Sequence, residues 1–221
     1  MGPLSSSAGF TAILIGAAIV GGLPAALTAL ALAFDTTESA AISDAAASLA
    51  TGFSSLESSF ESGWHSWLGG LNAPPASVSG TPALETQYYV SLMELKADED
   101  KTYTGAFIAA PNLPWGASVS ADTGTGDSGQ HGYHMAWTRD EYEMASSLLA
   151  AGDTTDALAA LNYIFQYEVE SSGAVKQNTW LNGNTVFGSL QMDEVADPII
   201  LAWQLGATSS TDWGYVEELG C

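Results

Sequence analysis

Apolar side chains recur at spacings of three or four residues between residues 36 and 71. This spacing places one apolar stripe along a helix of about eight to ten turns. The polar residues 35–38 can cap its start, and residues 72–75 (Asn-Ala-Pro-Pro) stop it. We therefore predict a linker helix within residues 36–75. Its stripe is Ile42, Ala46, Leu49, Phe53, Leu56, Phe60, Trp64, Trp67 and Leu71.

The aromatic residues at the C-terminal end of this stripe favour packing against a globular domain, although the spacing also permits a coiled coil. Residues 10–34, which precede the linker, carry no charge. They are numerous enough to span a bilayer, but no basic residue flanks them to set an orientation. Residues 1–35 are therefore either the end of a preceding domain or a membrane or signal segment.

The remainder, residues 76–221, has the pattern of stacked helical hairpins. Gly152 and Gly206 are suitable residues to follow helix ends, and Asp153 is suitable to cap a helix that buries Leu158. A short extended segment over residues 105–114 and polar loops over residues 116–132 and 173–188 connect these helices. We predict an all-α fold. Its helices run from residue 86 to 98, from 140 to 151, from 153 to 165 and from 190 to 205.

Composition narrows the possible partners. The 221 residues are 47% hydrophobic, enough for a packed core, and the net charge is −21 because only 4 Lys and Arg face 25 Asp and Glu. Such a surface repels nucleic acid and anionic lipid. It suits a salty, acidic or extracellular setting, where screening or protonation lowers self-repulsion, or it reflects compositional drift. We expect an extracellular or cell-surface location, with membrane association through residues 10–34 and a cytoplasmic location left open.

The only arginine, Arg139, lies in a short polar and aromatic cluster. Its neighbours include Tyr133, His134, Trp137 and Asp140. A pyranose presents apolar C–H faces to aromatic rings and hydroxyls to charged or amide groups. The cluster is therefore a candidate sugar site, and the alternative is a structural ion pair between Arg139 and Asp140 at a helix start.

Two later segments carry similar groups. Residues 176–183 contain Trp180, which either binds sugar or plugs the core. Residues 191–194 begin with Gln191, and their two acids, Asp193 and Glu194, either join the site or form a solvated helix face. The histidines lack the arrangement of a metal triad, and no serine has the context of a nucleophile. We expect neither a metal nor another cofactor, and the single thiol, Cys221, cannot form an intramolecular disulfide.

Several motifs occur in an order that resembles the prokaryotic-type glucoamylases of glycoside hydrolase family fifteen. The resemblance extends over residues 84–206 and includes Gly-Tyr-His-Met-Ala-Trp-Thr-Arg-Asp at residues 132–140. The other matching segments are residues 92–103, 105–110, 113–116, 177–183 and 191–195.

The resemblance implies an (α/α)6 barrel that releases glucose from the non-reducing ends of α-glucans with inversion. By the same resemblance, Arg139 and Asp140 grip hydroxyls of the terminal glucose, while Tyr133 and Trp137 line that subsite. Trp180 and Gln191 belong to the later matching motifs. Phe187 stands where relatives commonly carry tryptophan, near the second sugar.

The family's catalytic acid and base are expected beyond Cys221, so the resemblance implies a fragment without turnover. It comprises the remnant of an N-terminal domain, the linker helix and the first hairpins of a partial (α/α)6 barrel. Inversion needs two carboxyls roughly 6.5–9.5 Å apart. The pair Glu217-Glu218 lacks the preceding tryptophan of the family's acid motif. Alternatives are a trehalase or glucodextranase of the same architecture, or a non-catalytic sugar-binding or membrane-tethered remnant.

Overall fold

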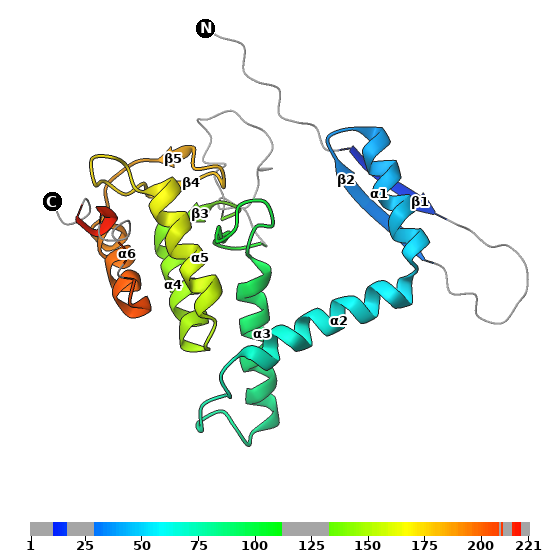
Figure 1. Cartoon of the computed structure of the whole chain (residues 1–221), viewed down its shortest axis with the longest axis horizontal. Coiled ribbons are helices and arrows are strands. Elements are labelled where there is room, and N and C mark those ends of the chain that lie inside the picture. Colours follow the sequence, from blue (N-terminus) through cyan, green and yellow to red (C-terminus); the bar gives the residue numbers. More distant parts are fainter. Residues whose placement is uncertain (1–10, 17–28, 112–132, 208, 210–213, 218–221) are drawn as a thin grey trace, which may run out of the picture. The chain divides into compact units, whose positions relative to one another are not determined.

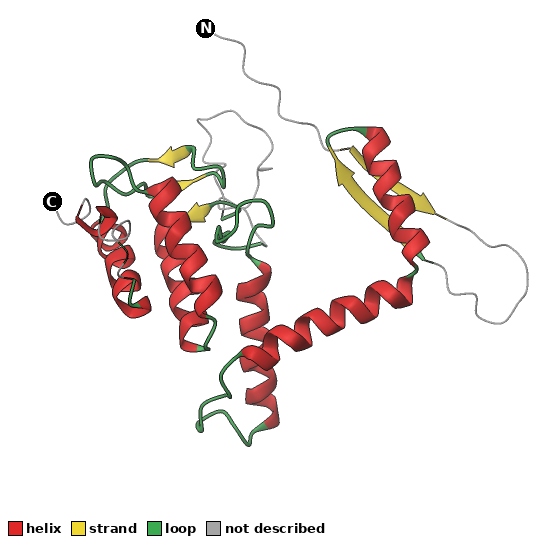
Figure 2. Ribbon diagram, viewed as in Figure 1, coloured by secondary structure: helices red, strands yellow, loops and turns green. Residues whose placement is uncertain are grey.

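The structure, a computed structural model, describes residues 11–16, 29–111, 133–207, 209 and 214–217. The chain forms two compact units, Met1–Gly69 and Gly70–Cys221. Helices dominate the described residues (Figure 2). The loop predicted over residues 116–132 and the end of the extended segment, residues 112–114, lie outside the description.

The first unit contains a two-stranded antiparallel sheet covered by a helix (Figure 1). Strands β1 (Thr11–Gly16) and β2 (Leu30–Asp35) come from the apolar stretch 10–34. Helix α1 (Glu38–Thr51) follows, and Thr37 caps it by accepting a hydrogen bond from Ala40 N at 3.2 Å. No helix in the described part of the chain is both long and apolar enough to cross a membrane.

The prediction of one continuous linker helix was wrong. Helix α1 ends at Thr51 and helix α2 spans Phe53–Gly70, with Gly52 between them at φ 85°. Only glycine adopts such a conformation without strain, so the break occurs there although the apolar spacing continues through it. The predicted stripe on α1 was also displaced. Ala41 and Ala45 are buried while Ile42 is exposed, because small side chains let the helix approach the sheet closely.

The second unit confirms the predicted helices. They are α3 (Pro82–Ala97), α4 (Thr138–Ala150), α5 (Thr154–Tyr163) and α6 (Met192–Leu205). Asp153 caps α5 through Asp156 N at 3.0 Å, and Gly206 ends α6 at φ 63°. Leu158, predicted to be buried, is 41% exposed on α5.

A π-helical turn, η2 (Ile164–Glu168), extends α5. Helices α4 and α5 form the predicted hairpin, and α6 packs against α4 (Figure 1).

The description all-α needs correction, because a small sheet lies at one end of these helices. It joins β3 (Ala136–Trp137), β4 (Asn178–Thr179) and β5 (Thr185–Phe187) in the antiparallel order β3-β4-β5. The strands are too short to show an alternation of apolar and polar residues. Residues 173–188, which contain β4 and β5, were therefore predicted to be a polar loop. The described ranges do not include a closed barrel, and the partial (α/α)6 barrel stays a prediction.

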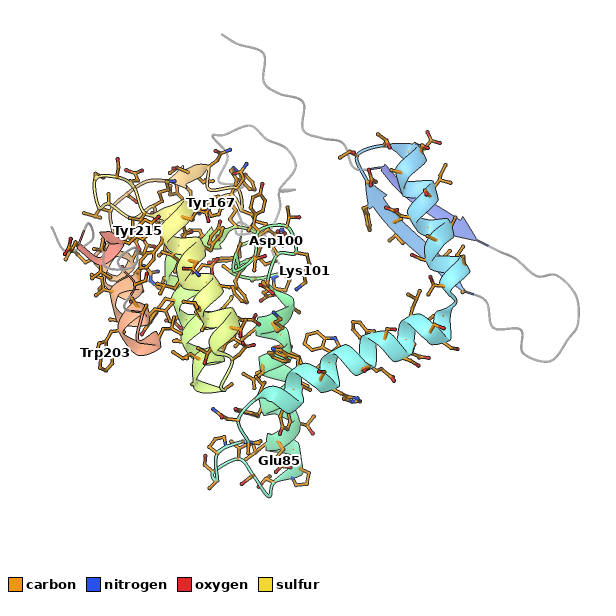
Figure 3. The ribbon with its side chains drawn as sticks, viewed as in Figure 1. Glu85, Asp100, Lys101, Tyr167, Trp203 and Tyr215 are labelled. Carbon is orange, nitrogen blue, oxygen red and sulfur yellow. The ribbon has the colours of Figure 1, made fainter. Side chains whose placement is uncertain are left out.

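The core of this unit lies between α4, α5, α6 and the segment that follows α3. Phe107, Leu148, Leu161, Ile164 and Leu201 are completely buried in it. The segment after α3, which carries Asp100 and Lys101 (Figure 3), turns back on itself and is closed by an antiparallel bridge between Glu99 and Phe107. Among its described residues, the predicted extended conformation is limited to this bridge. The segment passes so close to α5 that a Cβ on Gly105 would lie 2.1 Å from Ala159 O, and Gly105 also has φ 83°. Glycine is therefore required at this position.

Candidate functional site

The predicted site residues gather where α4 and α6 begin and the small sheet ends. Strand β3 runs directly into α4, so Trp137 closes the strand and Arg139 lies in the first helical turn. Gln191 precedes α6 in the same way and is its N-cap residue. Two helix N-termini therefore present their first side chains at the same end of the unit, near the sheet.

Arg139 joins these two helix starts. Its Nε donates to Asp193 Oδ2 at 2.6 Å, and its Nη2 donates to Gln191 Oε1. Glu194 Oε1 lies 3.9 Å from the same Nη2. The hydrogen bond from Arg139 lowers the pKa of Asp193. Arg139 therefore forms its ion pair with Asp193 on α6. The alternative considered from the sequence was a local ion pair with Asp140.

Asp140 is half-buried beside this pair. Burial raises the pKa of its carboxyl, although a hydrogen bond from its own backbone N–H and the charge of Arg139 oppose that change. Its position in the first turn of α4 places a carboxylate where the helix dipole is favourable.

Three aromatic rings form a row of successive contacts, and its central ring, Trp137, lies two residues before Arg139 in the chain. The centroids of Tyr133 and Trp137 are 6.1 Å apart, and those of Trp137 and Phe187 are also 6.1 Å apart. The sheet register explains the second contact, because Trp137 pairs with Asn178 and Asn178 pairs with Phe187. Residues opposite one another across strands point to the same face. Trp137 Nε1 is buried without a hydrogen-bond partner in the described part of the structure.

Trp180 lies outside the sheet, in the turn after β4. Trp180 N donates to Asn184 O at 2.9 Å, and Gly183 N donates to Trp180 O at 2.7 Å. The side chain is 40% exposed, so Trp180 is not a plug of the core. His134, which the sequence groups with Arg139, contacts Pro111 O through its Nε2 at 3.2 Å.

Three completely buried glutamates lie beneath the site, and the sequence had pointed to only one of them, Glu194. Glu141 on α4, Glu168 on η2 and Glu194 on α6 are completely buried. Burial raises the pKa of Glu168 and of Glu194 to about 8. Burial, and then the charge of Glu168, raise the pKa of Glu141, whose Oε1 accepts a hydrogen bond from Phe107 N at 2.7 Å.

The sequence offered one signal for these glutamates. Glu194 was noted beside Gln191 and Asp193, and the alternative of a solvated helix face does not hold for Glu194, which is buried. Asp193 is exposed to solvent and pairs with Arg139. Nothing in the sequence singled out Glu168, because its burial depends on the extra residue per turn of the π-helix.

A cavity of about 650 Å³ lies elsewhere, between α3 and the end of α4. Leu92, Leu95 and Ala151 line it, and none of the predicted site residues does. Across the described ranges, no group of three or more His, Cys, Asp or Glu residues could hold a metal ion. The candidate site is therefore the row of aromatic rings and the adjoining arginine.

Known protein families match both units of the chain. Residues 83–219 match the sequence profile of Glycosyl hydrolases family 15, and residues 16–69 match that of Glucodextranase, domain N. A glucoamylase from Clostridium sp. (strain G0005) is 37% identical over 176 residues, which cover 80% of this chain and 23% of that protein.

The structure is similar to the crystal structure of a bacterial glucoamylase complexed with acarbose. The TM-score is 0.66 at 35% sequence identity, and the match covers 79% of this chain and 24% of that chain. This chain thus spans about a quarter of the length of the relatives that it matches.

Proposed function

Since this chain belongs to glycosyl hydrolases family 15, we propose that it forms one wall of the glucose-binding site of a glucoamylase. The activity of the whole enzyme is then inverting hydrolysis that releases glucose from the non-reducing ends of α-glucans. Tyr133, Trp137, Arg139, Asp140 and Gln191 bind the terminal glucose. Trp180 and Phe187 serve the sugars further along the substrate.

The observation that carries this proposal is the fixed orientation of the Arg139 guanidinium at the start of α4, two residues after Trp137, the central ring of the aromatic row. Asp193 and Gln191 use its Nε and Nη2, which holds the planar group in one orientation. A guanidinium has five N–H donors in a fixed fork, so donors remain for ligand hydroxyls. An aromatic face beside a fixed fork matches the apolar face and the hydroxyl edge of a pyranose.

We also propose that the 221-residue chain binds sugar without cleaving it. An inverting enzyme needs an acid and a base that both reach the scissile bond. The three carboxyls with the strongest burial, those of Glu141, Glu168 and Glu194, are enclosed by the core and cannot contact a substrate. Asp140 is a ligand of the sugar in this proposal, and the catalytic carboxyls belong to the family's later motifs.

Calorimetric titration of the chain with acarbose tests both statements. We expect saturable binding that Arg139→Ala abolishes and Arg139→Lys weakens, because lysine lacks the fork that Asp193 and Gln191 orient. Lys101→Ala is the matched control, since it removes a cation whose side chain is 74% exposed. Failure to bind acarbose would contradict the binding role, and glucose release from maltose or soluble starch would contradict the absence of turnover.

A glucodextranase is the second candidate, and the match of residues 16–69 to that enzyme's domain N favours it. The two candidates differ in linkage, because dextran is linked α-1,6 and starch mainly α-1,4. Tighter binding of isomaltotriose than of maltotriose would support the glucodextranase. A preference for trehalose over both would support a trehalase instead.

The N-terminal unit is proposed to be the end of a preceding domain followed by the linker. Strand β2 and helix α1 fall within the residues that match domain N, whereas only the last residue of β1, Gly16, does. We propose an extracellular or cell-surface location on the basis of the net charge of −21. Detection of the protein in a washed cytoplasmic fraction, and not in medium or on the cell surface, would refute it.

A further inference from the structure

Thr138 makes two short contacts that compete for one proton. This residue is completely buried and lies between Trp137 and Arg139 at the start of α4. Its Oγ1 lies 2.8 Å from Lys176 O and 2.9 Å from Glu168 Oε2. A hydroxyl has one proton to donate, and a carbonyl oxygen only accepts. If Thr138 donates to Lys176 O, the contact with Glu168 needs a proton from the carboxyl.

The other carboxyl oxygen of Glu168 continues the same chain of contacts. Thr179 Oγ1 lies 3.4 Å from Glu168 Oε1 and 3.3 Å from the hydroxyl of Tyr163. Tyr163 in turn donates to Leu181 O at 3.1 Å. A backbone carbonyl oxygen thus ends this series of hydrogen bonds on each side, Lys176 O on one and Leu181 O on the other. Each carbonyl accepts a hydrogen bond and cannot donate one.

The count of protons favours a neutral Glu168. The series contains five contacts. When Glu168 is ionised, the hydroxyls of Thr138, Thr179 and Tyr163 supply only three hydrogens to them, and a protonated Glu168 supplies a fourth. Only the neutral form gives a proton to both short contacts of Thr138. If Glu168 were ionised, Thr138 could donate to only one of its two neighbouring oxygens. The other contact would then bring two oxygens together with no hydrogen between them, which is costly in a buried site.

The groups around Glu168 act in both directions. Its charge would interact unfavourably with Glu141 on α4, Glu194 on α6 and Tyr163 on α5. Hydrogen bonds from Thr138 and Thr179 and the charge of Lys176 lower the pKa of Glu168, but less than burial raises it. The ammonium of Lys176 is directed to Tyr167 O at 2.7 Å and to Gly183 O at 3.0 Å, so it does not bind the carboxyl directly. Burial is the largest cause that raises the pKa of Glu168 to about 8.

We propose that Glu168 is a positioning residue that acts as a neutral carboxylic acid, with its O–H donating to Thr138 and holding the junction of β3 and α4. Thr138 is the residue between Trp137 and Arg139, so this contact sets the direction in which both side chains leave the backbone. The π-helical turn that places Glu168 beneath the sheet is thereby linked to the site. The effect on sugar binding rests on the proposed function.

The test compares the affinity for acarbose between pH 6 and pH 10 in matched variants. In the wild-type chain we expect the affinity to fall roughly tenfold as pH rises through about 8, because the carboxylate can no longer donate to Thr138. Glu168→Gln keeps a donor and an acceptor at every pH, so its affinity should stay near the acidic wild-type value. Glu170→Gln, the same change at an exposed residue of the same segment, should retain the wild-type profile.

Two further variants separate this role from general structural support. Thr138→Val should lower the affinity for acarbose at pH 6 and abolish its decrease at alkaline pH. Thr138→Ser keeps the hydroxyl, so it should show the wild-type affinity at pH 6 and the wild-type decrease at alkaline pH. Glu194→Gln should keep the alkaline fall, since Glu194 faces Arg139 and not Thr138. An alkaline fall that persists in Glu168→Gln, or loss of binding in that variant at pH 6, would overturn the proposal.

Infrared difference spectra test the protonation without a sugar. Burial raises the pKa of Glu141 and Glu194 as well, so the wild-type chain at pH 7 should show several carboxylic-acid carbonyl bands. One of them should be missing in Glu168→Gln and present in Glu170→Gln. Absence of that band would overturn the proposal even if acarbose binds. If the band is present and acarbose does not bind at any pH, Glu168 is neutral as inferred and it is the proposed sugar-binding function that fails.

Discussion

Arg139 Nε lies 2.6 Å from Asp193 Oδ2, and this pair joins the first turns of two helices that begin 54 residues apart. Both side chains are nearly half exposed, at 43% and 47%. An exposed ion pair contributes little to stability, because water screens it. Its value lies in orientation, since Asp193 and Gln191 hold the guanidinium fork in one direction at the start of α4.

Asp193→Asn should therefore impair binding more than folding. The amide keeps an acceptor but loses the charge, so Arg139 becomes less well oriented and acarbose affinity should fall roughly fivefold to tenfold. Calorimetry measures this, and thermal unfolding should show almost no change. Glu143→Gln, an exposed change on α4, is the control. Unchanged affinity in Asp193→Asn would separate this pair from the site.

Phe187→Trp should strengthen the binding of longer sugars. Phe187 is at the end of the aromatic row, 6.1 Å from Trp137, and a larger ring offers a wider stacking face. We expect the affinity for maltotriose to rise about threefold to tenfold while that for glucose stays the same. Phe187→Ala should have the opposite effect. An equal gain for glucose would place Phe187 at the terminal subsite instead.

The free energy of unfolding should fall as pH rises from about 5 to about 8. In this range a buried carboxyl such as that of Glu194 is protonated in the folded state and ionised in the unfolded state, so raising the pH favours unfolding. Burial raises the pKa of Glu194 to about 8, and the unfolded chain releases that proton near pH 4.3. Glu194→Gln removes this contribution, so its melting temperature should depend less on pH. Glu168 has the same sign and should leave a residual slope. An unchanged slope in Glu194→Gln would contradict the assignment.

Lys96→Met should destabilise the second unit. Its ammonium lies 2.7 Å from Glu99 Oε2 and 2.5 Å from Asp156 Oδ2, joining α3 to the segment after it and to α5. Methionine preserves the aliphatic packing and leaves two largely buried carboxylates without a cation, at a cost of roughly 1–3 kcal/mol. Denaturant unfolding measures the loss. Lys101→Met, at a side chain 74% exposed, should be nearly neutral.

Salt should stabilise the protein. The net charge of −21 produces self-repulsion that counterions screen. The melting temperature should rise by several degrees, about 3–8 °C, between low salt and 1 M sodium chloride. Sodium sulfate at matched ionic strength separates screening from stronger apolar burial. A melting temperature that is independent of sodium chloride would show that the acidic side chains are too dispersed to repel one another.

The family was readable from the sequence because its motifs are local, and the same motifs supplied the candidate site residues. Arg139 stood out as the only arginine, and its motif is contiguous with Trp137 and Asp140. The ends of α4, α5 and α6 were predictable as well, since capping by Asp153 and termination by Gly206 are local events. The family match over residues 83–219 confirms the resemblance drawn from these motifs.

Only the tertiary structure determined which of these groups meet. The partner of Arg139 is Asp193 rather than its neighbour Asp140, because α4 and α6 begin side by side. The ring contact of Trp137 with Phe187 depends on a register through Asn178 in strands too short to leave a periodic pattern. The burial of Glu168 depends on a π-helical turn. Sequence by itself determines local conformation and residue chemistry, whereas contacts across dozens of residues, and the burial that changes a carboxyl's pKa, exist only once the chain is packed.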